Sequence, residues 1–319
     1  MPFRRNRPDP TVTLDLTGID LGPPPERSWV GAGRRRRSTT NAPTVSRAGI
    51  NGLAGLCMLA LVVTGLGLPL PGGHLAADAI LVVVGFQLGL GVMRLAGSSP
   101  DWLRRYWLSA IIPVVAPTMV AVTLVATYWW LLDLLGPAET RGALASLLMA
   151  TNLTPLFGDA TFPGTEHLWL ISLIVHFAVA APVAAILTRR TAGARTRARI
   201  IIALVAVVIV ARLTIALTGL LSASTLAQLP ITRADGLLVG LGLAIAPRSW
   251  IERIPSRAVP AALAALVAVF ALAPDPAQRP AVSLGVLLPV VVVASAVIVA
   301  SRTPTSTNVV RGRRGTGTP

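Results

Sequence analysis

Charged residues are scarce in this chain of 319 residues. They make up 13% of the sequence, whereas a soluble domain is usually about one quarter charged. Hydrophobic residues make up 53%, and the mean hydropathy is +0.70. The shortage of charge excludes an ordinary cytosolic enzyme, and the apolar excess excludes a disordered protein. This composition is typical of an integral membrane protein.

Lysine is absent, so all 28 basic residues are Arg, and 13 acidic residues leave a net charge of +15. Such a charge can indicate a nucleic-acid-binding protein, but that interpretation needs a basic face on a soluble module. The Arg residues instead form clusters between apolar runs, as in the cytoplasmic loops of membrane proteins. We therefore expect a multi-pass protein of a bacterial plasma membrane, with the lipid bilayer as its partner and without nucleic acid.

Cysteine and histidine are also rare. Cys57 is the single cysteine, which excludes an internal disulfide and a Cys-rich metal site. The three His residues are too few for a convincing metal centre. The sequence predicts no bound metal.

The apolar runs divide the chain into three parts. Residues 1–47 are polar and Arg-rich, and we expect a disordered cytoplasmic tail that could dock a protein partner. Residues 48–301 form the expected membrane domain, and 302–319 a second disordered basic tail. A helix needs about 20 residues to cross the ~30 Å hydrocarbon layer. Candidate spans lie at 49–70, 75–95, 107–132, 168–188, 199–220, 234–247, 258–274 and 282–301.

The fold class that follows is an all-α, polytopic membrane bundle of about eight transmembrane helices, in the range 8–10. With the N-terminus inside, nearly all Arg clusters fall in inner loops, whereas the outer loops contain chiefly Arg141 and Arg279. One helix more or fewer would invert every cluster beyond it. An even count with both termini cytoplasmic is therefore expected.

Three segments resemble blocks of the acyltransferase-3 family of integral membrane proteins. The first is NGLAGLCMLALVVTGLGLPLPGGHLAADAILVVVGF, the second is TNLTPLFGDATFPGTEHLWLISLIVHFAVAAP, and the third is ITRADGLLVGLGLA. They occur in the family's order within residues 50–247. The resemblance implies a ten-helix membrane fold and transfer of acyl groups, often acetyl, to envelope glycans or glycolipids. It implies acetyl-CoA or another acyl-CoA as co-substrate, with no permanently bound cofactor.

The chain departs from the family's pattern at the positions that the resemblance implies to be catalytic. Asn51 and Val62 stand at the positions of the family's Arg and His in the first helix. Ile174, Val175 and His176 replace the Glu-Glu-Gln of the second block. Because a general base needs a titratable group, Val62 cannot serve as one. The sequence indicates a short, divergent member with a degraded catalytic pattern.

Polar residues inside the expected spans are the remaining site candidates, since a charge at the membrane centre costs at least ~2.5–3.5 kcal/mol. His176 and Asp78 are the catalytic candidates. Asp78 either pairs with Arg233 or caps its helix, and Arg233 and Asp235, two residues apart, should reach different neighbours. Arg212 is expected to be paired and to face a cavity suited to an anion. Substrate-binding candidates are Arg212, Arg233, Asp235, Trp169, His167 and His74, and the candidates for the acyl donor's phosphates are Arg104, Arg105, Arg189 and Arg190.

Three functions stay open at this stage. The first is an acyltransferase acting on an envelope glycan or glycolipid. The second is a non-catalytic relative that serves as a membrane partner or scaffold in envelope assembly. The third is a transporter of small solutes or lipids, which broken helices and an intramembrane Arg would allow.

Overall fold

A computed structural model describes residues 47–302, except 67, 69, 97–99, 158–161, 164, 166 and 190–192. The expected N-terminal and C-terminal tails therefore lie almost wholly outside the described residues. The described part is built of helices, and no strand occurs within it. The expectation of an all-helical protein is confirmed for these residues.

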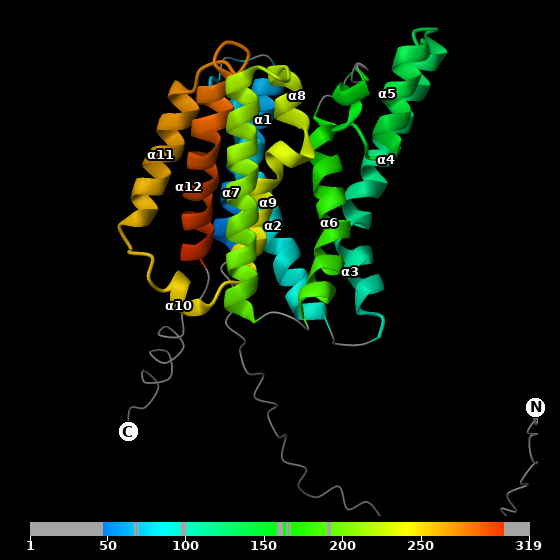
Figure 1. Cartoon of the computed structure of the whole chain (residues 1–319). Coiled ribbons are helices and arrows are strands. Elements are labelled where there is room, and N and C mark those ends of the chain that lie inside the picture. The colour runs from blue at the N-terminus through cyan, green and yellow to red at the C-terminus, as the bar shows by residue number, and fades with distance from the viewer. Residues whose placement is uncertain are drawn as a thin grey trace, which may run out of the picture. The chain divides into compact units, whose positions relative to one another are not determined.

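The helices follow one another with short connections (Figure 1). Their order is α1 (Arg47–Gly65), η1 (Gly73–Leu75), α2 (Ala76–Leu95), α3 (Trp102–Ala110), α4 (Ile112–Leu131), α5 (Pro137–Leu147), η2 (Thr154–Phe157), α6 (Leu168–Arg189), α7 (Ala194–Thr218), α8 (Ala223–Gln228), α9 (Pro230–Ile245), α10 (Arg248–Ile251), α11 (Ala258–Leu272), the π-helical η3 (Ala281–Leu287) and α12 (Leu288–Ser301).

Five segments are long and apolar enough to cross a membrane: Gly73–Leu95, Ile112–Leu131, Leu168–Ile186, Ala194–Thr218 and Ala281–Ser301. The apolar helices Gly49–Gly65 and Ala258–Leu272 are shorter, and α9 has 16 residues. A 16-residue helix rises only about 24 Å. Each expected span coincides with one of the described helices or a consecutive pair of them.

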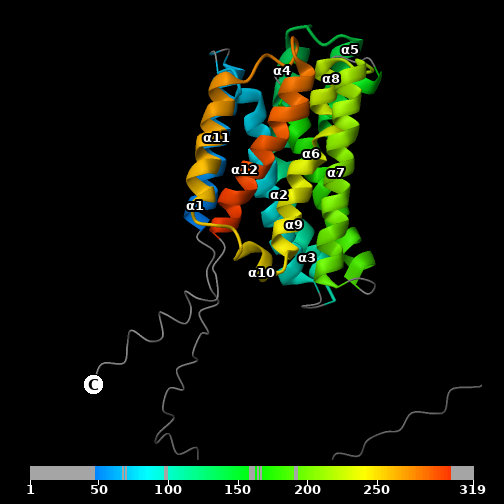
Figure 2. The same ribbon diagram turned by 60° about the vertical axis from the view of Figure 1, so that its left-hand side comes forward.

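Helix α2 runs through the middle of the bundle, where it packs against α1, α6, α9 and α12 (Figures 1 and 2). Most of its length is buried, whereas α4 and α7 expose most of theirs. The helical framework therefore surrounds α2. The start of α1 and the end of α12 lie at the same end of the bundle, where Gly49 approaches the Arg302 side chain.

Glycines allow α2 and α9 to pack closely. Gly85 and Gly89 on α2, and Gly236 and Gly240 on α9, each form a G-x-x-x-G pair. A Cβ at Gly85 would lie 2.2 Å from the Leu237 carbonyl oxygen, and one at Gly240 would lie 2.2 Å from that of Val82. Membrane helices use such small residues to bring their backbones together.

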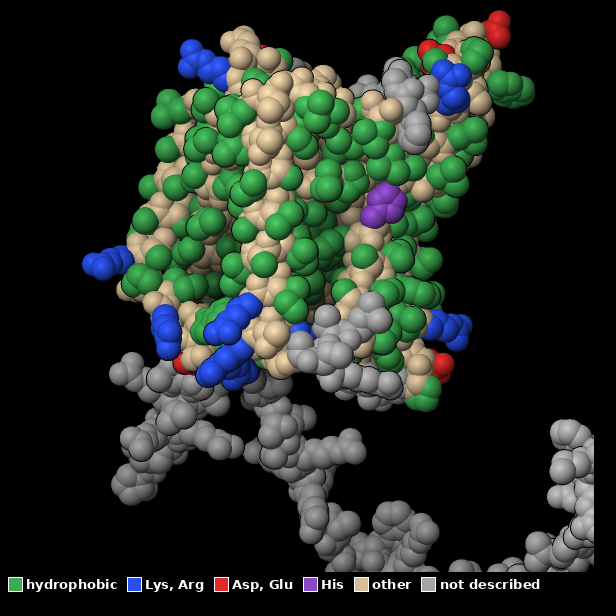
Figure 3. Space-filling model, in the orientation of Figure 1, with side chains coloured by type: hydrophobic (Ala, Val, Ile, Leu, Met, Phe, Trp, Pro, Cys, Tyr) green, Lys and Arg blue, Asp and Glu red, His purple; other side chains and the backbone are tan. Residues whose placement is uncertain are grey.

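The outer surface of the bundle is apolar. On α7 the side chains of Ile202, Val207 and Val210 are each more than half exposed, and α4 exposes Leu124 and Trp130 in the same way. Figure 3 shows hydrophobic side chains over the middle of the visible face, with Arg side chains towards its two ends. A soluble protein rarely exposes so large an apolar surface, so the bundle is suited to a membrane.

Arg residues gather at one end of the bundle, which we call the Arg-rich end. It contains the ends of α2, α7, α10, α11 and α12 that carry Arg94, Arg195, Arg197, Arg199, Arg248, Arg253, Arg257 and Arg302, together with Arg104 and Arg105 of α3. The opposite end carries Arg141 and Arg279 among the described residues. This asymmetry agrees with the expected distribution of Arg between the loops.

Candidate functional site

A break between α8 and α9 positions the polar residues of the site. Leu229 is extended (φ −65°, ψ 135°) and Pro230 begins α9. The Thr232 hydroxyl donates a shared hydrogen bond to the Leu226 carbonyl oxygen at 2.6 Å and to the Leu229 carbonyl oxygen at 2.9 Å. The last carbonyls of a helix have no partner within the helix. Thr232 therefore stabilises the end of α8 from the first turn of α9.

Arg233 joins three helices at this break. Its Nε donates to the Ala227 carbonyl oxygen of α8 at 2.9 Å. Its Nη1 donates to Asp78 Oδ2 on the first turn of α2, forming an ion pair. The guanidinium carbon lies 5.2 Å from the centroid of the Trp169 ring on α6, within the range of a cation–π contact.

Arg212 of α7 forms a second ion pair with α9. Its Nη2 donates to Asp235 Oδ2 at 2.9 Å, and its Nη1 donates to the Thr232 carbonyl oxygen at 2.7 Å. Both side chains are fully buried. The prediction that Arg212 is paired is confirmed, as is the prediction that Arg233 and Asp235 reach different neighbouring helices.

These four residues form what we call the charge cluster: Asp78, Arg212, Arg233 and Asp235. None is more than 2% exposed, and their formal charges cancel. One oxygen of each carboxylate, and Arg212 Nε, have no hydrogen-bond partner among the described residues. In a buried pair, loss of one partner typically costs about 3–5 kcal/mol. The cluster therefore fixes α2, α7 and α9 to one another.

Arg212 contacts a carboxylate of the protein itself, where the sequence led us to expect a cavity for an anion. Four cavities formed by described residues are all lined by other side chains. Asp235 occupies the position that a bound phosphate or carboxylate would take beside Nη2. The sequence shows that an intramembrane Arg needs a partner, but it does not distinguish an internal carboxylate from a ligand.

His176 lies apart from the charge cluster, about two turns after Trp169 on α6. Its side chain is exposed, and its Nδ1 lies 3.3 Å from the side-chain nitrogen of the buried Asn152. Asn152 Oδ1 has no hydrogen-bond partner among the described residues. Since amide oxygen and nitrogen are assigned by their contacts, rotating the amide by 180° would let Oδ1 accept from Nδ1–H.

The other two His residues lie at the end of the bundle opposite the Arg-rich end. His74 Nε2 and Ser283 Oγ, in the π-helical η3, share a hydrogen bond of 2.7 Å. The exposed His167 lies against α1, where a Cβ at Gly65 would be 2.8 Å from its Nε2. Among the described residues, no hydrogen bond joins either His to the charge cluster.

A polar pocket of about 380 Å³ opens between α1 and α2, towards the Arg-rich end. The exposed side chains of Asn51, Gln87 and Arg94 line it together with the apolar Ile50 and Phe86. Asn51 is the residue that stands in place of the family's Arg. Gln87 and Arg94 were not among the expected site residues, although an Arg in the last turn of an apolar helix is a visible signal.

The residues expected to bind the acyl donor's phosphates are only partly described. Arg104 and Arg105 lie on α3 and are exposed at the Arg-rich end. Arg189 is the last residue of α6, and its side chain lies outside the described part, as does the whole of Arg190. Neither Arg104 nor Arg105 lines the polar pocket.

Comparison of the chain with models of protein families, with curated proteins and with solved structures gave no match.

Proposed function

We propose that the chain crosses a bacterial plasma membrane about eight times and resembles the acyltransferase-3 family in architecture. The proposed crossings are α1, α2, α3 with α4, α6, α7, α9, α11, and η3 with α12. Alternate helices run in opposite directions (Figure 1), and the positive-inside rule assigns the Arg-rich end to the cytoplasm. Both termini of the bundle are then cytoplasmic.

The observation that carries the family proposal is the convergence of its three blocks. Asp78 comes from the first block, Trp169 from the second and Arg233 from the third, although they lie far apart in the sequence. Arg233 is paired with Asp78 and makes a cation–π contact with the Trp169 ring. Residues from three separate blocks of the resemblance thus meet around one guanidinium group.

The proposed activity is transfer of an acyl group to a hydroxyl of an envelope glycan or glycolipid. His176 is the proposed base, because it is exposed and Asn152 can hold its Nδ1–H, which leaves Nε2 unprotonated. The acceptor hydroxyl would give its proton to Nε2 as its oxygen bonds to the acyl carbon. The carbon–sulfur bond of an acyl-CoA breaks, and the imidazolium returns the proton to the leaving thiolate.

Under this proposal the donor's phosphates bind at the Arg-rich end. Arg104 and Arg105 of α3 carry charge there, and the polar pocket adds Arg94. Arg binds phosphate groups through charge-assisted hydrogen bonds. The charge cluster has a positioning role here, since its charges neutralise one another.

The test is an envelope acylation profile. Ester-linked acyl groups on glycans and glycolipids are measured in wild type, in a deletion strain, and in strains that carry His176→Gln or Asn152→Ala. We expect one acylated species to disappear in the deletion strain and in His176→Gln, and to decrease in Asn152→Ala. An unchanged profile in the deletion strain would overturn the acyltransferase proposal.

A second candidate is a non-catalytic membrane partner in envelope assembly. It is favoured by Val62, which replaces the family's His on α1 and is 50% exposed. This candidate predicts that a deletion phenotype is fully rescued by His176→Gln protein present at wild-type abundance. Failure of that rescue would argue against it.

A further inference from the structure

A second cavity, of about 300 Å³, lies between α6 and α7, with α2 and α9 at its floor. None of its lining residues belongs to the charge cluster or lines the polar pocket. Its lining is apolar except for one residue, and the residues that form its flanks are Ala180 on α6 and Ile200 and Leu204 on α7. Ile200 and Leu204 are 43% and 47% exposed, so the groove opens sideways on the outer surface of the bundle.

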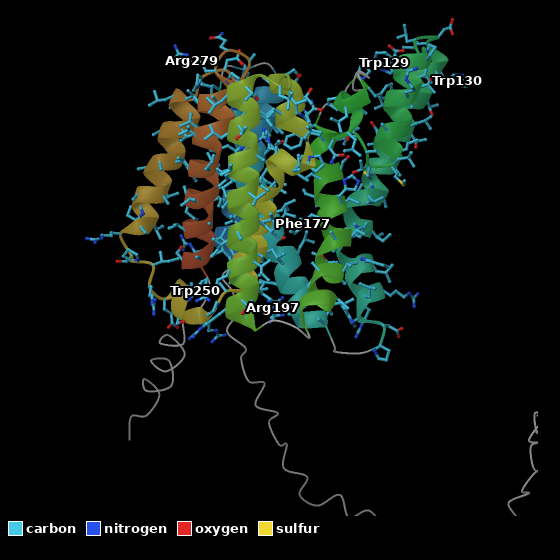
Figure 4. All side chains as sticks on the ribbon, in the orientation of Figure 1. Trp129, Trp130, Phe177, Arg197, Trp250 and Arg279 are labelled. Atoms are coloured by element: carbon cyan, nitrogen blue, oxygen red, sulfur yellow. The ribbon has the colours of Figure 1, made fainter. Side chains whose placement is uncertain are left out.

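The exception is Arg197, at the Arg-rich end of the groove. Among the described lining residues it is the only charged side chain. It is half-buried, and its Nε, which is buried, has no hydrogen-bond partner within the described residues. In Figure 4, Arg197 lies at the lower end of α7 and Phe177 lies higher, between α7 and α6. The groove therefore combines an apolar channel with a cationic end.

The length of the groove matches half of a bilayer. Ala185 follows Phe177 by eight residues on α6, which is a rise of about 12 Å along the helix. Half of the ~30 Å hydrocarbon layer is about 15 Å. A ligand that reaches the groove from the side must come through the lipid, and a ligand that satisfies Arg197 must carry an anionic group at the membrane surface.

We propose that this groove binds one anionic phospholipid of the inner leaflet. One acyl chain lies along Ala180, Phe177 and Leu204, and the headgroup phosphate accepts hydrogen bonds from Arg197. A zwitterionic lipid fits the apolar part equally well. An interaction of about 1 kcal/mol per Arg near the surface gives anionic lipid an advantage of about fivefold.

The experiment uses native mass spectrometry of the full chain, extracted from vesicles of equimolar phosphatidylglycerol and phosphatidylcholine with identical acyl chains. Wild type should retain phosphatidylglycerol about fivefold more than phosphatidylcholine. Arg197→Gln should lower that ratio to about one. Arg199→Gln is the matched control, because Arg199 is exposed, lies two residues further on α7 and does not line the groove.

Two further variants separate charge from shape. Arg197→Lys keeps the charge and should keep most of the preference. Ala180→Phe leaves the charge intact but fills the groove from an exposed position on α6, so retention of both lipids should fall. Equal retention of the two lipids by wild type would overturn the proposal. So would an unchanged ratio in folded Arg197→Gln, or wild-type retention in folded Ala180→Phe.

Discussion

Individual buried charges hold neighbouring helices together in this protein. Arg212 and Asp235 lie on different helices and have no exposed surface. A lone charge left in such a place keeps its desolvation cost and loses its attraction. The two residues should therefore be energetically coupled, which a double-mutant cycle measures directly.

Arg212→Met and Asp235→Leu should each lower the free energy of unfolding by about 3–5 kcal/mol. The double variant should recover most of that loss, because it leaves no uncompensated charge. The measurement is reversible unfolding in detergent, with Arg199→Met as a control at an exposed site on the same helix. Additive losses in the double variant would show that the two side chains do not act as a pair.

Tyr106 on α3 is a second residue with a testable cost, and it lies outside the expected span 107–132. It is 1% exposed, and its hydroxyl has no hydrogen-bond partner among the described residues. A buried hydroxyl without a partner keeps its desolvation cost.

Tyr106→Phe should leave stability at pH 7 unchanged or raise it by up to about 1–3 kcal/mol, since it removes a buried polar group without a partner. Thermal unfolding of wild type and variant at pH 7 measures the difference. A clear loss of stability at pH 7 would mean that the hydroxyl is hydrogen-bonded in solution.

At the scale of helices, close contact between α2 and α9 depends on glycine. Gly85→Ala and Gly240→Ala should each cost about 1–3 kcal/mol, because the new Cβ would collide with backbone atoms of the other helix. The controls are Gly52→Ala and Gly55→Ala on α1, where a Cβ meets no atom within 4 Å. These should stabilise α1 by about 0.5–1 kcal/mol.

Equal effects in the two pairs of glycine variants would contradict the packing account, since helix propensity alone would then explain them. Unfolding curves in the same detergent provide the comparison. The G-x-x-x-G spacing in both helices could have been recognised in the sequence. The pairing of these two motifs could not, because each also fits a contact with a second copy of itself.

At the scale of the whole molecule, the proposed topology makes a prediction about sidedness. In a Cys57→Ala background, Arg257→Cys and Arg279→Cys place exposed thiols before and after α11. A membrane-impermeant maleimide added to intact cells should label residue 279 and leave residue 257 unlabelled until the membrane is opened. Labelling of both, or of residue 257 alone, would contradict the proposed orientation.

The sequence predicts the helical architecture, because apolar runs and Arg clusters are local signals. It also identified the residues of the charge cluster, since a charge within an apolar run is conspicuous. It did not assign Arg212 to Asp235, because the distance between α7 and α9 depends on packing. The sequence did not predict the polar pocket or the apolar groove for the same reason. The lining residues of the pocket come from two helices, and those of the groove come from four.

The sequence by itself determined that this chain is an apolar helical protein with its positive charge concentrated in particular loops. Transfer of apolar surface out of water and the cost of buried charge act residue by residue, so composition and spacing reveal them. Only the tertiary structure decided which charges form ion pairs with one another. Arg212 and Arg233 are paired with Asp235 and Asp78, whereas no ion pair of Arg197 occurs among the described residues. That difference depends on atoms brought within about 3 Å by helix packing.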